Sequence, residues 1–337
     1  MYYFRRGEIL KKIYYTLLTI LILALFVTSY FYFTNFKEET GLQEITLGEV
    51  THSVFYTPLY VAIENDYFKE EGLDINLVLT SGADKVSAAV LSGDVQIGFA
   101  GAESAIYIYE KGEKDYLQIF SGLTKRDGQF ILSRNKVDNF SLKDLYGKEI
   151  LVGRQSGMPA LNFLNALKNE NIDTNKININ YSVDFAALSG TFIGGTGDYV
   201  NLFEPNALKL EQESFGYVVE SIGKLSGEMP YTAFYARKSY IKDNEEIIKS
   251  FIKAINKGLK YTNENKPETI ASIILKQFPD TSLNDLTILI ERYKTNDSWL
   301  PSTYISEELL ENLEDIMIDN NLLDDYIPYE DLIINYE

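Results

Sequence analysis

Cysteine is absent from the 337 residues of this chain, and histidine occurs once, as His52. Without a thiol the chain can form no disulfide, no thiolate nucleophile, no zinc–cysteine site and no lipid-modified cysteine. A Ser-His-Asp triad would have to use His52. The sequence also lacks a P-loop, a G-x-S-x-G nucleophile turn and a calcium-binding loop. We therefore predict a protein that is not an enzyme, with no catalytic residue, no metal site and no cofactor.

Positive charge is also scarce. Lysine and arginine number 31 against 49 aspartates and glutamates, which gives a formal net charge of -18. Nucleic acid is excluded as a partner because its phosphates would repel such a chain. We interpret the acidity as a source of solubility rather than as a sign of an acidic site. The length and the apolar content allow a large core, divided between two lobes.

One long uncharged run is present, near the N-terminus. It covers the 24 residues from Ile13 to Phe36 and follows a basic segment, residues 1–12. A helix of about 20 apolar residues crosses a bilayer, and basic flanks stay on the cytoplasmic side. We therefore expect a signal or transmembrane anchor at 13–36, a linker at 37–43, and an extracytoplasmic chain tethered to the cell membrane. Cleavage at Val27-Thr28-Ser29 would instead release the chain.

From residue 44 onward, strand-like and helix-like patterns alternate, which indicates an α/β fold with mostly parallel sheet. The alternation of strand and helix patterns begins again near residues 134–138, and the pattern of residues 240–337 predicts almost only helix. We expect a fold of two α/β lobes. Lobe 1 would comprise 44–133 plus 238–337, and lobe 2 would comprise 134–237. Two crossings between the lobes make a hinge, and a hinge makes a cleft.

At four points a strand gives way to a helix through small residues or proline. Proline is favoured at the first helical position, and a helix start presents free backbone N–H groups. Such starts at the carboxyl edge of a sheet are where α/β proteins bind ligands. A tight turn without a ligand is the alternative for any single junction. The four junctions are Tyr56-Thr57-Pro58, Gly101-Ala102-Glu103-Ser104, Ser156-Gly157-Met158-Pro159 and Phe203-Glu204-Pro205.

The stretches YTPLYVAIENDYFKEEGLD, SGADKV, GDVQIGFAG, GKEILVGRQSGMP, GDYVNLFEPNA and SGEMPYTAF occur in this order. Together they resemble the type II solute-binding proteins of ABC importers, and within them the SsuA/THI5-like (NMT1) family, over about residues 44–320. The resemblance implies the two-lobe α/β fold of type II periplasmic binding proteins. It also implies that the lobes close on a small solute and deliver it to a permease and its ATPase. Yeast-type pyrimidine synthases of the same group carry a cysteine-rich iron motif. That activity is not carried over to a chain without cysteine.

The resemblance implies a ligand site on the rims of both lobes and at the hinge. Glu204 could pair with a pyrimidine-like heterocycle stacked between aromatic rings, or its carboxylate could interact with the following helix start instead. His52 could be a polar loop residue or a donor that lines the cleft. The expected site residues are Tyr56, Thr57, Gly101, Ala102 and Glu103 of lobe 1, Arg154, Gly157, Met158, Phe203 and Glu204 of lobe 2, and Tyr231 and Thr232 of the hinge.

Other ligands and other classes of protein remain open from the sequence. A sulfonate or nitrate would use the helix-start N–H groups and Arg154, and riboflavin is a further candidate. An enzyme on the same fold, like some proteins of the menaquinone pathway, would work inside the cell. A sensor ectodomain would have to signal through a partner, because only residues 1–12 precede the membrane run.

Overall fold

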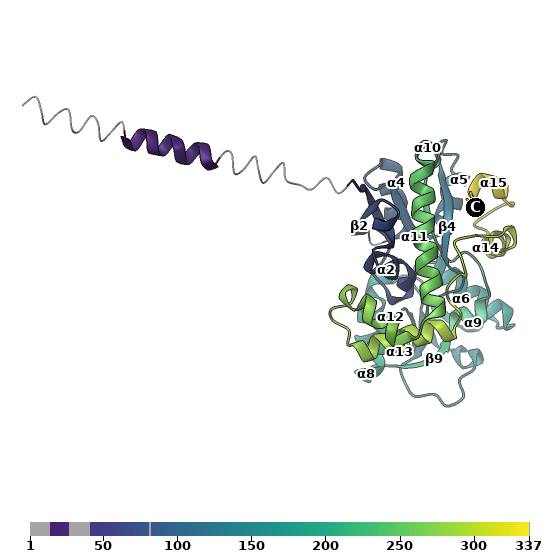
Figure 1. The fold of residues 1–337 in the computed structure, drawn as a ribbon. Coiled ribbons are helices and arrows are strands. Elements are labelled where there is room, and N and C mark those ends of the chain that lie inside the picture. The colour runs from purple at the N-terminus through teal and green to yellow at the C-terminus, as the bar shows by residue number, and fades with distance from the viewer. Residues whose placement is uncertain (1–13, 27–40, 81, 337) are drawn as a thin grey trace, which may run out of the picture. The chain divides into compact units, whose positions relative to one another are not determined.

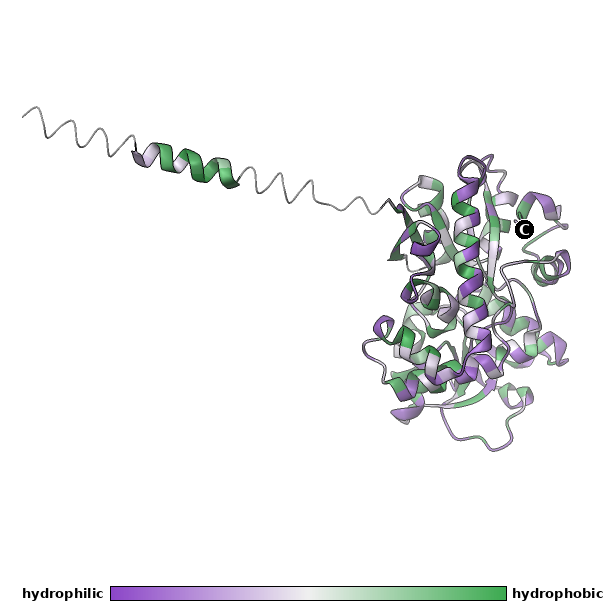
Figure 2. Ribbon diagram, in the orientation of Figure 1, coloured by the Kyte–Doolittle hydropathy of each residue, from purple (hydrophilic) through white to green (hydrophobic). Residues whose placement is uncertain are grey.

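The structure, a computed structural model, describes residues 14–26, 41–80 and 82–336. Residues 14–26 form a helix with exposed apolar side chains (Figures 1 and 2). Gln43–Glu337 form a second, separate compact unit. No helix within the described ranges combines the length and hydropathy that a bilayer crossing requires. The expected segment 1–12, residues 13 and 27–36 of the expected anchor and residues 37–40 of the linker lie outside the described residues.

The larger unit contains two five-stranded sheets, as the sequence pattern predicts. In the order of pairing, the first sheet is formed by β2 (Leu73–Leu79), β1 (Gln43–Glu49), β3 (Ile97–Gly101), β10 (Thr232–Arg237) and β4 (Leu117–Thr124). The second is formed by β7 (Asn178–Asn180), β6 (Glu149–Leu151), β8 (Tyr199–Leu202), β5 (Phe130–Ser133) and β9 (Tyr217–Ser221).

The chain passes from the first sheet to the second between β4 and β5 and returns between α9 (Ile222–Ser226) and β10. Each of these crossings delivers an antiparallel strand into the middle of a sheet. β5 pairs with β8 and β9, and β10 pairs with β3 and β4. The expected boundaries assign β5 to lobe 1 and β10 to lobe 2, so the two sheets exchange these strands relative to that expectation. The strand pattern alone could not show which neighbours each strand would pair with.

Helices cover both sheets, and most begin where the sequence predicts. A single helix is expected from Pro58 to Gly72, but the structure has two, because Asp66 adopts the left-handed conformation at φ 57° and interrupts it. The helices up to residue 226, besides α9, are η1 (Val54–Tyr56), α2 (Thr57–Glu64), α3 (Tyr67–Glu70), α4 (Ala83–Ser92), α5 (Glu103–Glu110), η2 (Leu142–Leu145), α6 (Met158–Asn169), η3 (Thr174–Lys176), η4 (Phe185–Ala187), α7 (Leu188–Ile193) and α8 (Asn206–Gln212).

The C-terminal part is almost wholly helical, as expected. The long helix α11 runs alongside β4 and buries an apolar stripe that includes Phe251, Ile255 and Leu259 (Figures 1 and 2). Apolar residues spaced three and four apart lie on one helix face, which explains this burial. The elements are α10 (Lys238–Asp243), α11 (Glu245–Glu264), α12 (Pro267–Ile274), η5 (Leu275–Gln277), α13 (Leu283–Thr295), α14 (Glu307–Asp319) and α15 (Tyr329–Leu332).

The contact between α11 and α2 depends on Gly258. A Cβ atom at this position would lie 2.2 Å from the carbonyl oxygen of Pro58. We expect Gly258→Ala to lower the free energy of unfolding by about 1–3 kcal/mol, because the helices must move apart. Gly190 lies in α7 with no atom near its Cβ position, so Gly190→Ala is the matched control and should not destabilise. Urea denaturation measures both, and equal effects would contradict the close-contact explanation.

Candidate functional site

The four strand-to-helix junctions lie at two sheet edges. β1 and β3 are adjacent and parallel, and so are β6 and β8. Carboxyl ends of adjacent parallel strands meet at one edge of a sheet, so the first two junctions are neighbours and the last two are neighbours. Pro58 and Pro159 lie in the first turn of α2 and α6, as the second residue of each helix and so one position later than predicted. Pro205 instead precedes α8 as its capping residue.

The two sheet edges that carry these junctions lie against each other. The Ser53 hydroxyl donates to the carbonyl oxygen of Glu204 at 2.8 Å, which joins the first junction to the fourth. A Cβ atom at Gly101 would lie 2.7 Å from Met158 Cγ and 2.0 Å from Glu103 Oε2, so only glycine fits where the second junction approaches the third. The structure therefore brings all four junctions to one place.

Aromatic rings fill the centre of this meeting point. The Phe55 ring lies 5.6 Å from Tyr56, 5.4 Å from Phe203 and 5.7 Å from Tyr231, measured between ring centroids. All four side chains are buried. The sequence analysis selected Tyr56, Phe203 and Tyr231 but missed Phe55, although it adjoins Tyr56 in the same loop. The rings pack on one another in this conformation, so a ligand could enter only if the two sheets moved apart.

Glu103 is the acidic group of the site, at the first position of α5, and it is 3% exposed. Burial raises the pKa of Glu103 to about 7, against the opposing effect of hydrogen bonds from the backbone N–H groups of Glu103, Met158 and Ser104. Its Oε2 atom is buried without a hydrogen-bond partner in the described residues. Glu103 thus offers an acceptor at the place where the two sheets meet.

A second buried carboxyl, Asp127, was not anticipated. It lies in the first crossing between the sheets and accepts hydrogen bonds from Gln129 N at 2.5 Å and Gln129 Nε2 at 3.1 Å. Burial raises the pKa of Asp127 to about 7, and the Tyr231 side chain lies beside it. The only sequence signal was a polar run, KRDGQ, between two apolar strands.

Unpartnered acceptors surround the first turn of α6. Gln129 Nε2 donates to the carbonyl of Pro159 at 3.3 Å, and Asn162 Nδ2 donates to that of Met158 at 3.1 Å. The amide oxygens of Gln129 and Asn162 are buried and, among the described residues, have no partner. Because each amide nitrogen already donates a hydrogen bond, the atom without a partner in each case is the acceptor oxygen. Together with Glu103 Oε2, three acceptor atoms without a partner in the described residues lie around the first turn of α6.

Glu204 does not point an open carboxylate into the site, which corrects its expected role towards a heterocycle. Its Oε1 atom accepts from Arg292 Nη1 of α13 at 2.5 Å, and its Oε2 atom accepts from Leu208 N at 2.8 Å. This is the alternative that the sequence left open, a carboxylate that binds the following helix start. The distant partner, Arg292, could not be read from the sequence.

The other expected residues lie around the same place with structural contacts. Ala102 N donates to Tyr231 O at 3.4 Å, and the hydroxyls of Thr124 and Thr232 are 2.6 Å apart in the first sheet. The Thr57 hydroxyl donates to Val54 O at 2.6 Å. Gly157 caps α6, and Arg154 forms an exposed ion pair with Asp84 at 3.1 Å.

His52 is a structural residue and not a donor that lines the aromatic cluster. Its Nδ1 atom lies 2.7 Å from Glu49 Oε1, and its Nε2 atom lies 2.9 Å from the carbonyl of Gln277. Burial lowers the pKa of His52, but the hydrogen bond and the charge of Glu49 outweigh it, and the net direction is upward. Both ring nitrogens are therefore engaged in joining β1 to η5.

The raised pKa values of Glu103 and Asp127 make stability depend on pH. A carboxyl whose pKa is higher in the folded state stabilises the fold at low pH, and this stabilisation is lost as the pH rises through the folded-state pKa. We expect the free energy of unfolding of the ligand-free chain to fall from about pH 4.5 to about pH 7. Urea denaturation of the wild type and of Glu103→Gln/Asp127→Asn checks this. The double variant should lose less over that range, and an equal loss would contradict the assignment.

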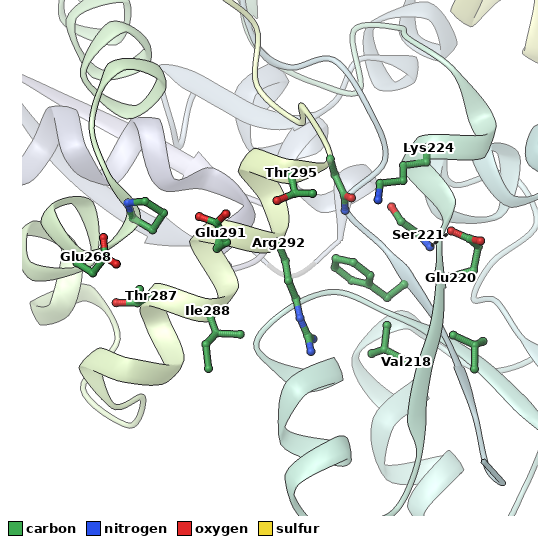
Figure 3. A pocket seen from close by; sticks show the side chains of 14 residues that line it. Val218, Glu220, Ser221, Lys224, Glu268, Thr287, Ile288, Glu291, Arg292 and Thr295 are labelled. Atoms are coloured by element: carbon green, nitrogen blue, oxygen red, sulfur yellow. Dashed lines mark hydrogen bonds between the residues drawn. The ribbon is translucent and has the colours of Figure 1, made fainter. Parts of the chain in front are cut away.

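A separate groove of about 680 Å³ lies outside this cluster, between β9 and α13 (Figure 3). None of the twelve expected site residues lines it. A second cavity of about 400 Å³ lies beside the Lys168–Asp319 ion pair, between α6 and the end of α14. No residue of the four junctions lines either of them, so the candidate site rests on its converging side chains and not on an open cavity.

Comparison with known proteins gives one family. A sequence model described as NMT1/THI5 like matches residues 54–269. YtlA of Bacillus subtilis (strain 168), whose name describes it as a binding protein, is 39% identical over 298 residues, which are 88% of this chain and 89% of that protein. The formylaminopyrimidine-binding protein of Halalkalibacterium halodurans is 23% identical over 252 residues, which are 70% and 73% of the two chains. These relatives are named as binding proteins, which confirms the prediction that the chain is not an enzyme.

Solved structures give the fold. The alkanesulfonate-binding protein SsuA from Xanthomonas axonopodis pv. citri, bound to MOPS, superposes with a TM-score of 0.69 at 14% identity. The match covers 87% of this chain and 98% of that one. It confirms the predicted mixed α/β fold with two sheets, of the kind found in periplasmic binding proteins.

Proposed function

The chain belongs to the NMT1/THI5-like family, and we propose that it binds a small solute outside the cytoplasm for an ABC importer. In this proposal the two sheets, with their helices, close on an aromatic heterocycle of the pyrimidine or thiamine-precursor kind. The closed protein then delivers the ligand to a permease and its ATPase. The observation that carries the proposal is the buried meeting point of four strand ends, which combines a ring cluster with Glu103.

The ring cluster favours a flat, aromatic ligand. Phe55 and Tyr56 lie in η1, which follows β1 of the first sheet, and Phe203 directly follows β8 of the second. Tyr231 lies in the second crossing, directly before β10. A planar guest that replaced their mutual contacts would keep most of the buried area and gain stacking of about 0.5–1.5 kcal/mol per ring pair. Phe185 extends the cluster outward, with its ring 5.5 Å from Phe203, and is partly exposed.

The charges disfavour an anion such as a sulfonate or nitrate. Glu103 and Asp127 are both buried at the meeting point, and a negative ligand between them would be repelled. Arg154, which an anion would need, is paired with Asp84 on an exposed rim. The free acceptors around α6 also call for a ligand that donates hydrogen bonds. An aminopyrimidine has such N–H groups, whereas nitrate and a sulfonate have none.

A thermal-shift panel on the full chain tests the proposal, with formylaminopyrimidine, riboflavin, an alkanesulfonate and nitrate as probes. A ligand present at 100 times its Kd stabilises a protein by about 2.7 kcal/mol. We expect the pyrimidine to raise the Tm and to be recovered chemically unchanged. Stabilisation by the anions alone would overturn the choice of ligand, and conversion of the ligand would overturn the binding role.

The N-terminal segment 13–36 completes the proposal as a membrane anchor. Its support is the uncharged run of 24 residues behind a basic segment. Membrane fractionation of cells that express the full chain tests this. The chain should remain with membranes after a high-salt wash, and release of the full-length chain into the soluble fraction would overturn the anchor. A chain found there shortened by about 30 residues would indicate cleavage instead.

A further inference from the structure

The groove between β9 and α13 has a shape that the proposed solute site does not explain. Its lining includes the four consecutive residues Val218 to Ser221 of β9. One face of a strand presents only every second residue, so the groove must border the edge of β9 and not merely one face. β9 is the last strand of its sheet, and in the part of the chain that the structure describes it pairs with β5 alone. An unpaired strand edge therefore faces a helix across the groove.

The opposite wall is a stripe of α13. Thr287, Glu291 and Thr295 recur every four residues, and Ile288 lies beside them with 38% of its surface exposed. Figure 3 shows these side chains across the groove from Val218, Glu220 and Ser221. Arg292 fixes this helix in place, because its guanidinium binds Glu204 at 2.5 Å and Glu211 at 2.6 Å. Glu204 lies between β8 of the second sheet and α8, and Glu211 lies in α8.

Two carboxylates cover part of the edge. Glu211 Oε1 accepts from Val218 N at 3.0 Å, and Glu220 Oε1 accepts from Ser221 N at 2.8 Å. Side chains that cap edge N–H groups are a known way to keep a strand from pairing indiscriminately. They can be displaced by a backbone that offers carbonyl groups in the same places. The Ser221 hydroxyl, which is buried and has no partner among the described residues, lies on the same wall.

The charge of the groove is negative. Glu220, Glu268 and Glu291 line it, whereas the charge of Arg292 is already balanced by two glutamates. Lys224 is the other basic residue in the lining. Val218 and Ile288 add apolar surface between these charges. A partner that complements the groove therefore has an extended backbone with free N–H and C=O groups, apolar side chains and positive charge.

We propose that this groove binds an extended, basic segment of a partner protein, which adds to β9 as a further strand and lays alternate side chains against α13. Strand addition to an exposed edge uses main-chain hydrogen bonds for affinity and side-chain contacts for specificity. None of the expected solute-binding residues lines this groove, so the inference does not depend on which solute the protein binds.

Fluorescence anisotropy with the full chain tests the proposal, with a labelled hexapeptide of alternating valine and lysine as the probe. We expect binding that weakens about tenfold or more when lysine is replaced by glutamate, or when alternate backbone amides are N-methylated so that they cannot pair. Amide exchange should slow at Val218 to Ser221 when the peptide is present.

Two charge-matched variants locate the contact. Ile288→Lys places a positive charge in the groove, and Leu283→Lys places the same charge on the same helix outside the lining, at a residue 44% exposed. Ile288→Lys should weaken peptide binding about tenfold, and Leu283→Lys should not change it. The proposal is overturned if no basic peptide binds at about 1 mM, if the two variants behave alike, or if N-methylation has no effect.

Discussion

Replacing Arg292 by methionine is expected to lower the free energy of unfolding by about 3–5 kcal/mol, because it leaves a buried carboxylate without its cation. Arg292 Nη1 lies 2.5 Å from Glu204 Oε1, and the Glu204 side chain is fully buried. Burial raises the pKa of Glu204 even beside Arg292. Without the arginine, the pKa of Glu204 must rise further, since the charge and the hydrogen bond of Arg292 both lower it. The measurement is urea denaturation of the full chain.

The pH dependence and a second variant separate this mechanism from a simple loss of packing. A raised pKa in the folded state costs stability as the pH rises, so the effect of Arg292→Met should be larger at pH 8 than at pH 5. Adding Glu204→Gln to Arg292→Met should recover part of the loss. Arg237→Met, which removes a half-exposed pair with Asp115 at 3.8 Å, is the matched control and should cost no more than about 1 kcal/mol. A loss that is the same at both pH values would contradict the account.

Replacing Glu103 by glutamine is expected to weaken binding of an aminopyrimidine about 10- to 150-fold, the range for a hydrogen bond to a charged group. Glutamine keeps the size of the side chain but offers an N–H group where the ligand also presents one. The ligand-free variant should be no less stable than the wild type at pH 8, because the substitution removes a charge whose burial is unfavourable. Isothermal titration and urea denaturation measure the two effects.

The split between binding and stability identifies the role of Glu103. Glu110 lies at the exposed end of the same helix, so Glu110→Gln is the control and should leave binding unchanged. If Glu103→Gln lowered stability and affinity together, Glu103 would be a structural residue. If neither changed, the ligand would not contact this carboxyl.

The fold could be predicted because its signals are local. Strand and helix periodicity, with Pro58 and Pro159 at helix starts, gave the order of elements and the four junctions. The assignment of β5 and β10 to sheets could not be predicted, because antiparallel insertion depends on contacts between distant segments. The break at Asp66 was missed because no glycine or proline marks it.

The residues of the candidate site likewise divide into those that the sequence could indicate and those that it could not. Tyr56, Glu103, Met158 and Phe203 could be selected from the sequence because each adjoins a junction that carries a small residue or a proline. Asp127, Gln129 and Asn162 were missed because their importance comes from burial against elements that are remote in sequence. For Glu204 the sequence left two roles open and could not indicate Arg292, which follows it by 88 residues.

The most direct test of the account is a crystal structure of the chain with the pyrimidine that gives the largest thermal shift. The account predicts the ring between Tyr56 and Phe203, with its N–H groups directed at Glu103 and at the free amide oxygens of Gln129 and Asn162. A ligand bound elsewhere, with the aromatic rings still packed on one another as they are in the free protein, would contradict it.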